Sequence, residues 1–203
     1  MKLGIIGLPH CGKTTLYCAL THDYSPTGQI FVDGRAQIDT AVVSVPDQRI
    51  DWLSTHYHPK KTSYAKIVFQ DISGITSGQE SFPRSLLTIL SQVDGFIHVV
   101  RNFDDPNIPH PMHHIDAESD INILLDEFAL NDMLTVERRL ESLSSEWDKG
   151  GGRSRTEIEY EQKLFEQLHD TLETDYGIGI VHLNKQQQKL VSGFGFLTSK
   201  PML

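Results

Sequence analysis

The sequence has few cysteines and no apolar run long enough to cross a membrane. Its two cysteines, Cys11 and Cys18, are too few for a disulfide framework, so we expect both to be free thiols. An apolar strand is predicted to begin almost at Met1, which leaves no space for a signal peptide. We therefore expect a cytoplasmic protein with no membrane partner.

Positive charge is also scarce. The chain of 203 residues has 18 Lys and Arg against 27 Asp and Glu, which gives a net charge of −9. This balance carries no direct signal for nucleic acid binding, and the pair Lys60-Lys61 is too short to count as a basic patch. The length allows one domain of ordinary size with an insertion.

A phosphate-binding pattern is present near the amino end. Residues 7–14, Gly-Leu-Pro-His-Cys-Gly-Lys-Thr, fit GxxxxGK[ST] and follow a short apolar run that predicts a buried strand. The backbone N–H groups of such a loop, together with the start of the next helix, bind a polyphosphate. The residues predicted to bind the nucleotide are Gly7, Pro9, His10, Cys11, Gly12, Lys13, Thr14 and Thr15. A glycine turn beside a surface lysine is the alternative.

Each residue type in this pattern has a chemical role. Glycine is expected at Gly7 and Gly12 because a side chain would block close approach of the backbone to the phosphates. Lys13 neutralises the β- and γ-phosphate oxygens, and the Thr14 hydroxyl is a Mg2+ ligand. The pattern therefore predicts a site for Mg2+ and a nucleoside triphosphate.

A DxxG pattern, Asp71 to Gly74, lies at the end of another predicted strand. Its acid can hold Mg2+ through water, so Asp71 is the second predicted metal ligand, and the Gly74 N–H is expected to contact the γ-phosphate. Many GTPases carry a glutamine after this glycine to orient the attacking water, whereas this chain has Ile75. We therefore expect unaided hydrolysis to be slow. An ordinary structural turn is the alternative for DxxG.

Apolar segments alternate with helical patterns over the first half of the chain. Strands are predicted at 2–7, 40–45, 65–70 and 95–100, with helices starting at residues 13, 47 and 82. This alternation predicts an α/β fold in which a parallel sheet is flanked by helices and the ligand lies at the carboxyl ends of the strands. We assign residues 1–117 to this nucleotide-binding domain.

A longer helical pattern follows between residues 118 and 192, where Gly150-Gly151-Gly152 separates two apolar stripes. The stripes consist of Met133, Val136, Leu140, Leu143 and Trp147 in the first, and Ile158, Phe165, Leu168 and Leu172 in the second. The first has coiled-coil spacing, so we predict an inserted antiparallel helical hairpin, with residues 193–203 returning to the sheet. Two helices packed flat on the core would have the same periodicity.

Five segments of the sequence together resemble the YchF/Obg-like ATPases, a branch of the Obg-related P-loop GTPases. They are GLPHCGKTTL, VSVPDQRID, DISGI, DGFIHVVRNFDDPNIPH and FLTSKPM, and the resemblance runs over nearly the whole chain. It implies a P-loop NTPase fold of the Ras-like G-domain type, hydrolysis of ATP or GTP, and association with ribosomes. The family has a hydrophobic residue in place of the glutamine, which Ile75 matches.

The resemblance also implies a catalytic residue. The family uses a histidine in the loop after the fourth strand, and alignment through DGFIHVVRNFDDPNIPH places His110 at that position. A neutral imidazole can orient the attacking water or accept its proton. His110 lies near His113 and His114, so a solvated histidine and a transition-metal site are the alternatives.

The sequence departs from the family pattern in several places. His10 replaces an asparagine tied to potassium binding, and residues 22–39 lack the first-switch signature. Arg35 stands near the position of the metal-sensing threonine, for which Thr27 and Thr40 are candidate substitutes. The chain stops where a fifth strand and a base-reading NxxE motif would follow. The nucleotide domain is therefore expected to be incomplete, and the choice between ATP and GTP stays open.

Three functions are compatible with these patterns. The sequence favours a slow P-loop NTP hydrolase that acts as a translation-associated switch, with Mg2+ as its cofactor. The alternative is a non-catalytic nucleotide-binding scaffold whose hairpin recruits a partner, and the lost first-switch signature favours it. A P-loop kinase is the third, and the DxxG pattern argues against it.

Overall fold

The computed structural model describes residues 1–22, 31–32, 35–36, 38–72, 82–112, 114–150, 152–174 and 177–203. The chain divides into two compact units. The first unit is Met1–Ile75, Val93–Ile115 and Met202–Leu203, and the second is Thr76–Gln92 and Asp116–Pro201. Among the helices in these described ranges, none combines the length and the apolar character that spanning a membrane requires.

A four-stranded sheet with the order β4-β5-β1-β6 is the centre of the first unit. The strands β1 (Lys2–Ile6), β5 (Lys66–Ile72) and β6 (Gly95–His98) are parallel, and β1 lies between the other two. Four of the five residues of β1 are buried, as expected for a strand in the middle of a sheet that is covered on both faces. The carboxyl ends of these strands lie at one edge, where the phosphate loop follows β1 and Asp71 is near the end of β5.

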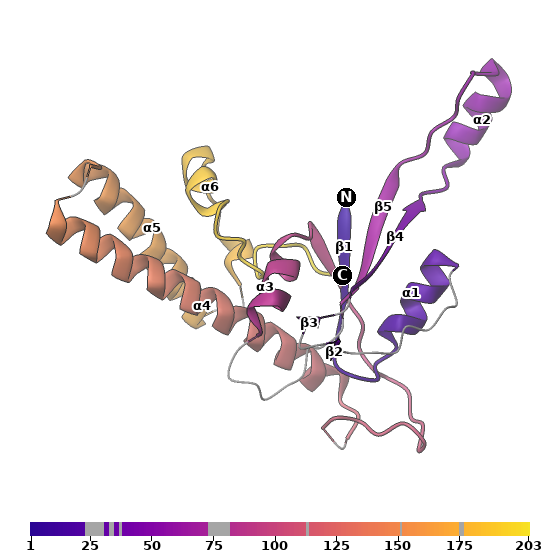
Figure 1. The fold of residues 1–203 in the computed structure, drawn as a ribbon, viewed down its shortest axis with the longest axis horizontal. Helices are drawn as coiled ribbons and strands as arrows, with labels where there is room; N and C mark the ends of the chain where they lie inside the picture. The colour runs from indigo at the N-terminus through magenta and orange to yellow at the C-terminus, as the bar shows by residue number, and fades with distance from the viewer. Residues whose placement is uncertain are drawn as a thin grey trace. The chain divides into compact units, whose positions relative to one another are not determined.

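The prediction of a parallel sheet is wrong for one of the strands. β4 (Ile38–Ser44) pairs antiparallel with β5, with Ile38 opposite Ile72 and Ser44 opposite Lys66. A parallel pair needs a crossover that packs on a face of the sheet, but the connecting helix α2 (Gln48–Tyr57) buries none of its residues. The chain instead runs out along β4, turns through α2 and returns beside it along β5 (Figure 1). The sheet is therefore mixed.

Helix α1 (Lys13–Thr21) follows the phosphate loop and packs on the sheet. Its Tyr17 joins a buried cluster with Leu3, Ile5 and Phe69. A second, two-stranded ribbon consists of β2 (Phe31–Val32) and β3 (Arg35–Ala36), and at the other edge of the main sheet Met202 pairs with Phe96 of β6. Both cysteines are free thiols, as predicted.

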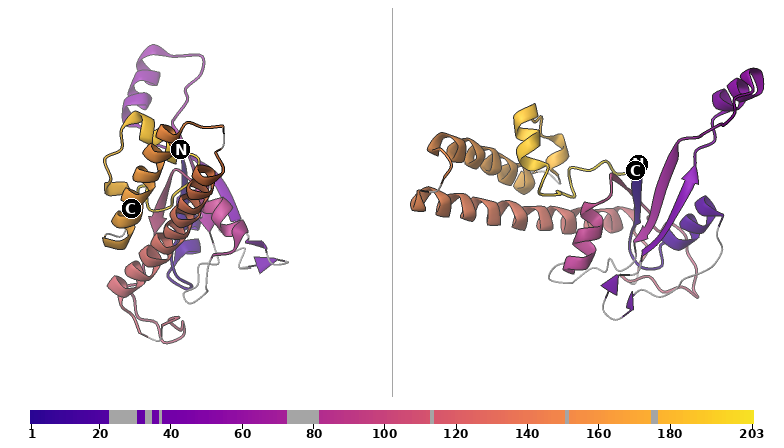
Figure 2. Two further views of the ribbon diagram at one scale, coloured as in Figure 1. Left: turned by 90° about the vertical axis from the view of Figure 1, so that its left-hand side faces the viewer. Right: turned by 45° about the horizontal axis from the view of Figure 1, so that its top comes forward.

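The second unit is helical. Its elements are α3 (Arg84–Ser91), α4 (Ala117–Lys149), α5 (Arg155–Thr174), the 3-10 helix η1 (Ile178–Ile180) and α6 (Lys185–Val191). The long helix α4 starts at an Asp116 cap and ends at Gly150, which has a left-handed φ of 62°. The helices α4 and α5 lie side by side in every view (Figures 1 and 2). The chain reverses between them, so they form the predicted antiparallel hairpin.

The hairpin has its own apolar core. Six residues of the two predicted stripes are buried: Val136, Leu143, Ile158, Phe165, Leu168 and Leu172. Residues after α5 complete this core, because Ile178 and Phe196 join the same cluster. The return segment is fixed by Asp132 of α4, which accepts hydrogen bonds from the Leu197 N–H at 3.0 Å and the Thr198 N–H at 2.8 Å.

Candidate nucleotide site

The phosphate loop lies between β1 and α1, and three of its residues have positive φ. They are Gly7 at 148°, His10 at 62° and Gly12 at 105°. Gly12 is also the N-cap of α1, where no side chain accepts a hydrogen bond from the first turn of the helix. The free N–H groups of a helix start carry partial positive charge, so this end of α1 is suited to an anion.

The two loop glycines are required for different reasons. A Cβ on Gly7 would lie 2.2 Å from the carbonyl oxygen of Val99, which follows β6, so glycine lets two backbone segments approach closely. A Cβ on Gly12 would meet no described atom within 4 Å, so at this position the constraint is the positive φ. The phosphate approach that we predicted for both glycines stays a prediction.

Lys13 is folded back onto the loop. Its side chain is buried, and Nζ donates a hydrogen bond to the carbonyl oxygen of Leu8 at 2.8 Å. The sulfur of Cys11 lies 4.0 Å from the same ammonium group. The positive charge is therefore held directly over the loop backbone. Of the other predicted contacts, Pro9 is half-buried, while His10 and Thr15 are exposed.

The two predicted metal ligands lie in contact. The Thr14 hydroxyl donates a hydrogen bond of 2.7 Å to Oδ2 of Asp71, which is the last residue but one of β5. Asp71 is only 3% exposed, and within the described part of the chain its Oδ1 has no hydrogen-bond partner. A buried carboxylate oxygen without a donor is costly unless a cation or water completes it, so this pair fits a hydrated Mg2+.

The electrostatic surroundings of Asp71 support the same interpretation. Burial raises the pKa of its carboxyl group above the ordinary value of 3.8, and the nearby charge of Asp39 adds to this rise. The hydrogen bond from Thr14 and the charge of Lys13 lower the pKa but do not fully compensate. The ionised carboxylate is thus under-stabilised by the protein alone, and a bound cation would correct this.

His110 lies in the loop that follows β6. Its side chain is buried, and Nδ1 accepts a hydrogen bond from the Met112 N–H at 3.2 Å. A pocket of about 560 Å3 in this loop is lined in part by Asn102, His110 and His114. This hydrogen bond is with the backbone of the same loop, and the approach of His110 to a bound phosphate stays a prediction.

Arg101 was not singled out in the sequence, although it organises this loop. The side chain is 1% exposed and donates to the carbonyl oxygens of Phe103 at 3.1 Å and Ile108 at 2.9 Å. Two longer contacts of 3.5 Å reach further carbonyls of the loop, and the guanidinium lies 4.7 Å from the centre of the Phe103 ring. Arg101 therefore fixes the backbone that carries His110. An arginine directly after an apolar strand was the available signal.

Several predicted residues fall outside the described part of the chain. They are Gly74, Ile75, Thr27 and His113. Of the other first-switch candidates, Arg35 begins β3, and Thr40 of β4 accepts a hydrogen bond of 3.3 Å from the Gln70 amide.

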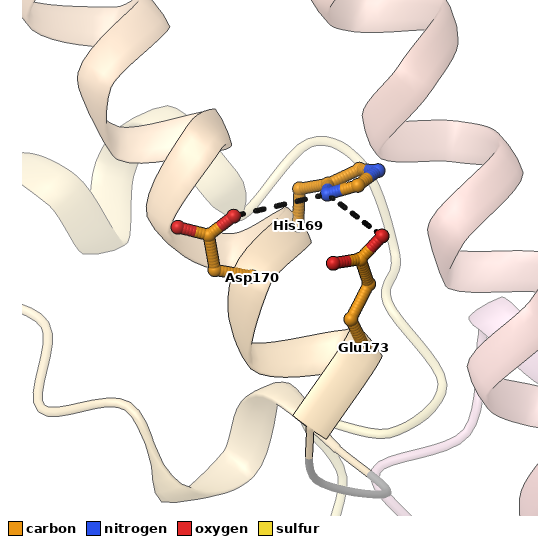
Figure 3. A group of neighbouring side chains, drawn as sticks. All are labelled: His169, Asp170 and Glu173. Atoms are coloured by element: carbon orange, nitrogen blue, oxygen red, sulfur yellow. Dashed lines mark ion pairs between the residues drawn. The ribbon is translucent and has the colours of Figure 1, made fainter.

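A second group of possible metal ligands lies on α5 (Figure 3). The Nδ1 atom of His169 is 4.0 Å from Oδ1 of Asp170 and 3.9 Å from Oε1 of Glu173. All three come from one helix, and the two acidic side chains are 83% and 61% exposed. These features indicate a solvated surface cluster near the carboxyl end of the helix rather than a metal site.

The fold and the loop geometry define an α/β protein of the P-loop NTPase type. A positive-φ glycine loop, its lysine and the Thr14–Asp71 pair lie at the carboxyl ends of the central strands, where this class binds its ligand.

Comparisons with known proteins identify the relatives of the chain, although no protein-family model matches it. It is 34% identical over 206 residues to the Ribosome-binding ATPase YchF of Bacillus subtilis, covering 100% of this chain and 55% of the relative. Obg-like ATPase 1 of Schizosaccharomyces pombe is 30% identical, with 100% and 53% covered. The solved structure of the Schizosaccharomyces pombe YchF GTPase matches with a TM-score of 0.76 at 28% identity, over 100% of this chain and 55% of that one.

These comparisons confirm the resemblance and the α/β P-loop fold class. The chain is a homologue of the YchF/Obg-like ATPases along its whole length. It spans about half the length of the curated relatives that it matches.

Proposed function

We propose that the chain is a P-loop nucleoside triphosphatase that binds ATP or GTP with Mg2+ and slowly hydrolyses the γ-phosphate. The hydrogen bond between Thr14 and Asp71, beside the Lys13 loop, is the observation that supports this function most. We further propose that it acts as a cytoplasmic, ribosome-associated switch, because similar proteins are named ribosome-binding ATPases.

In this proposal each residue of the loop has one task. The N–H groups at the start of α1 bind phosphate oxygens, and Lys13 exchanges the Leu8 carbonyl for the β- and γ-phosphates. Thr14 and Asp71 would hold the metal, and Gly74 would sense the γ-phosphate. Mg2+, when bound, would neutralise charge on the phosphate oxygens.

The catalytic group that we propose is His110. Its imidazole would orient the attacking water or accept its proton, since Ile75 can do neither. Arg101 is the positioning residue, because it ties the carbonyl groups on either side of the loop to one buried guanidinium. Hydrolysis would be slow whenever the loop is away from the phosphates, as it is for enzymes that wait for a partner.

The proposed division of the chain follows from these tasks. Residues 1–117 would bind the nucleotide, and 118–192 would form the hairpin that contacts a partner. Residues 193–203 would return the chain to the sheet. In a switch of this kind the nucleotide state alters the loops around the γ-phosphate, and this change is transmitted to the surface that the partner binds.

The experiment is a calorimetric titration of ATP and of GTP, each with Mg2+, into the parent chain and into Lys13→Ala. We expect the variant to lose triphosphate affinity, because it removes the charge that neutralises the phosphates, and its melting temperature serves as the folding control. Equal binding by folded parent and variant would refute the nucleotide site. Single-turnover phosphate release then separates an enzyme from a scaffold that binds without turnover.

A further inference from the structure

Helix α2 exposes large apolar side chains without burying any residue. Trp52 is 63% exposed, Leu53 46% and Tyr57 71%. The Trp52 and His56 rings are stacked at 5.3 Å with an interplanar angle of 5°, and His56 meets the edge of Tyr57 at 4.9 Å. In the first unit, α2 lies at the end of the β4–β5 pair (Figure 1). Clustered aromatic rings in contact with solvent mark an interaction surface.

Polar contacts, rather than these rings, hold α2 and its loop in place. Asp47 caps the start of the helix by accepting from the Arg49 N–H at 2.9 Å. Ser54 and Thr62 are joined by a hydrogen bond of 2.6 Å, which fixes the loop after the helix. The Tyr64 hydroxyl donates a further hydrogen bond to Asp51. The exposed rings of Trp52 and Tyr57 take part in none of these polar contacts except through the backbone of the helix, and they are available for a partner.

The charge of this segment is opposite to that of the protein. Between residues 45 and 66 four basic residues, Arg49, Lys60, Lys61 and Lys66, stand against two acidic ones in a chain of net charge −9. Both acids are already engaged, Asp47 by Arg49 and Asp51 by Tyr64. Within the described ranges Lys60, Lys61 and Lys66 make no ion pair. Salt screens the remaining negative charge beyond about 10 Å, so these ammonium groups act locally.

We propose that α2 and the loop after it are a docking surface for an unpaired RNA segment. Bases stack on Trp52 and Tyr57, and the ammonium groups of Lys60 and Lys61 bind the phosphates. Tyr57 and Lys61 line one pocket between α2 and the loop after it. An aromatic ring beside a cation without an ion pair suits a single-stranded nucleic acid, because every base has a face that can stack. An apolar peptide would leave the lysines unused. This inference deepens the proposed ribosome association and rests on it for the source of the RNA.

Fluorescence anisotropy with a labelled, unstructured RNA of about 12 nucleotides tests the proposal. Trp52→Ala with Tyr57→Ala should weaken binding by at least about tenfold, while Trp52→Phe with Tyr57→Phe should retain most of the affinity. Lys60→Ala with Lys61→Ala should reduce the slope of log affinity against log salt by about 1.4. The matched control removes two exposed lysines of α6, Lys185 and Lys189, and should bind as the parent does.

Three results would overturn the proposal. They are absence of RNA binding by the parent, equal binding by the folded Trp52→Ala, Tyr57→Ala variant, and a parent dimer that this variant dissociates. The last would show that a second copy of the chain covers α2. The nucleotide site is tested separately, because Lys13→Ala should leave RNA binding unchanged and the α2 variants should leave nucleotide affinity unchanged.

Discussion

The buried carboxylates at the phosphate loop and in the helical hairpin differ in how completely the protein supplies them with partners. In the hairpin, Glu161 is 3% exposed and lies between Arg139 and Arg153, with N–O distances of 2.7 and 2.5 Å. At the nucleotide site, Asp71 is equally buried, yet one of its oxygens has no donor among the described residues. Glu161 supports the fold, and the protein itself supplies ion-pair partners to both of its oxygens. A buried carboxylate oxygen without a donor, as in Asp71, indicates that a ligand completes the site.

The largest expected effect is a loss of stability when the fully paired carboxylate of Glu161 is removed. Glu161→Ala would remove the buried carboxylate that Arg139 and Arg153 share, and leave them only the more exposed Glu146. We expect the free energy of unfolding to fall by about 3 kcal/mol in urea titrations, with nucleotide affinity unchanged. Glu159→Gln, which breaks the exposed pair with Lys163, is the control and should have no measurable effect. If both variants are equally stable, the interhelical pairs do not stabilise the hairpin.

Asp132 is a second buried carboxylate of the helical unit, with a smaller expected effect, and unlike Asp71 it is hydrogen-bonded on both oxygens, although burial raises its pKa as well. Besides two backbone N–H groups it accepts from the Thr198 hydroxyl at 2.7 Å. Asp132→Ala leaves the Leu197 and Thr198 donors without their acceptor, and we expect a loss of about 2 kcal/mol by urea unfolding. Thr198→Val tests the hydroxyl alone and should lose less. An Asp132→Ala protein as stable as the parent would contradict this anchoring role.

At the phosphate loop, removal of a buried carboxylate should increase the stability of the protein instead of lowering it. Asp71→Asn removes a buried, under-stabilised charge and can keep the hydrogen bond from Thr14, so stability at neutral pH should rise by on the order of 1 kcal/mol. Mg2+-dependent triphosphate binding should be lost in the same variant. Functional sites commonly trade stability in this way. Loss of both stability and binding would mean that the Asp71 carboxylate stabilises the fold, as the carboxylate of Glu161 does.

The strand, loop and helix around residues 7–14 were predicted well because their signal is local. The loop residues are consecutive, and their residue types follow directly from phosphate chemistry. The contact between Thr14 and Asp71 agrees with their predicted role as ligands of one metal ion, although the order of the strands was not predicted. The hairpin was predictable from its period, since Leu143 and Phe165 occupy the apolar stripes.

Other features depend on contacts that no local pattern encodes. The direction of β4 depends on whether α2 packs on the sheet, and the apolar residues of α2 gave no indication that all of them stay exposed. The task of Arg101 depends on carbonyl groups whose orientation is set by the folded loop. Similarly, Glu161 of α5 pairs with Arg139 of α4 and with Arg153 between the two helices, and none of these charges is distinctive in the sequence.

The smallest effect is a dependence of stability on pH, which has opposite signs for Glu161 and Asp71. Burial raises the pKa of Glu161, but the hydrogen bonds and charges of Arg139 and Arg153 outweigh it and hold the pKa below 4.5. The stability from these ion pairs is therefore complete above about pH 4.5 and is lost as pH falls through the lower, folded-state pKa. Asp71, with its pKa raised above 3.8, imposes a cost at neutral pH that is relieved as pH falls through that raised value.

Urea unfolding between about pH 3 and pH 7 therefore distinguishes the two sites. Glu161→Gln should flatten the acid loss of stability, because the variant has no carboxyl group at position 161 to protonate. Asp71→Asn should make the acid loss steeper than in the parent, since the compensating relief at the phosphate loop is removed. Parallel curves for the two variants would mean that the loop carboxylate is as fully stabilised by the protein as the one in the hairpin, and the argument for a missing cation at Asp71 would fail.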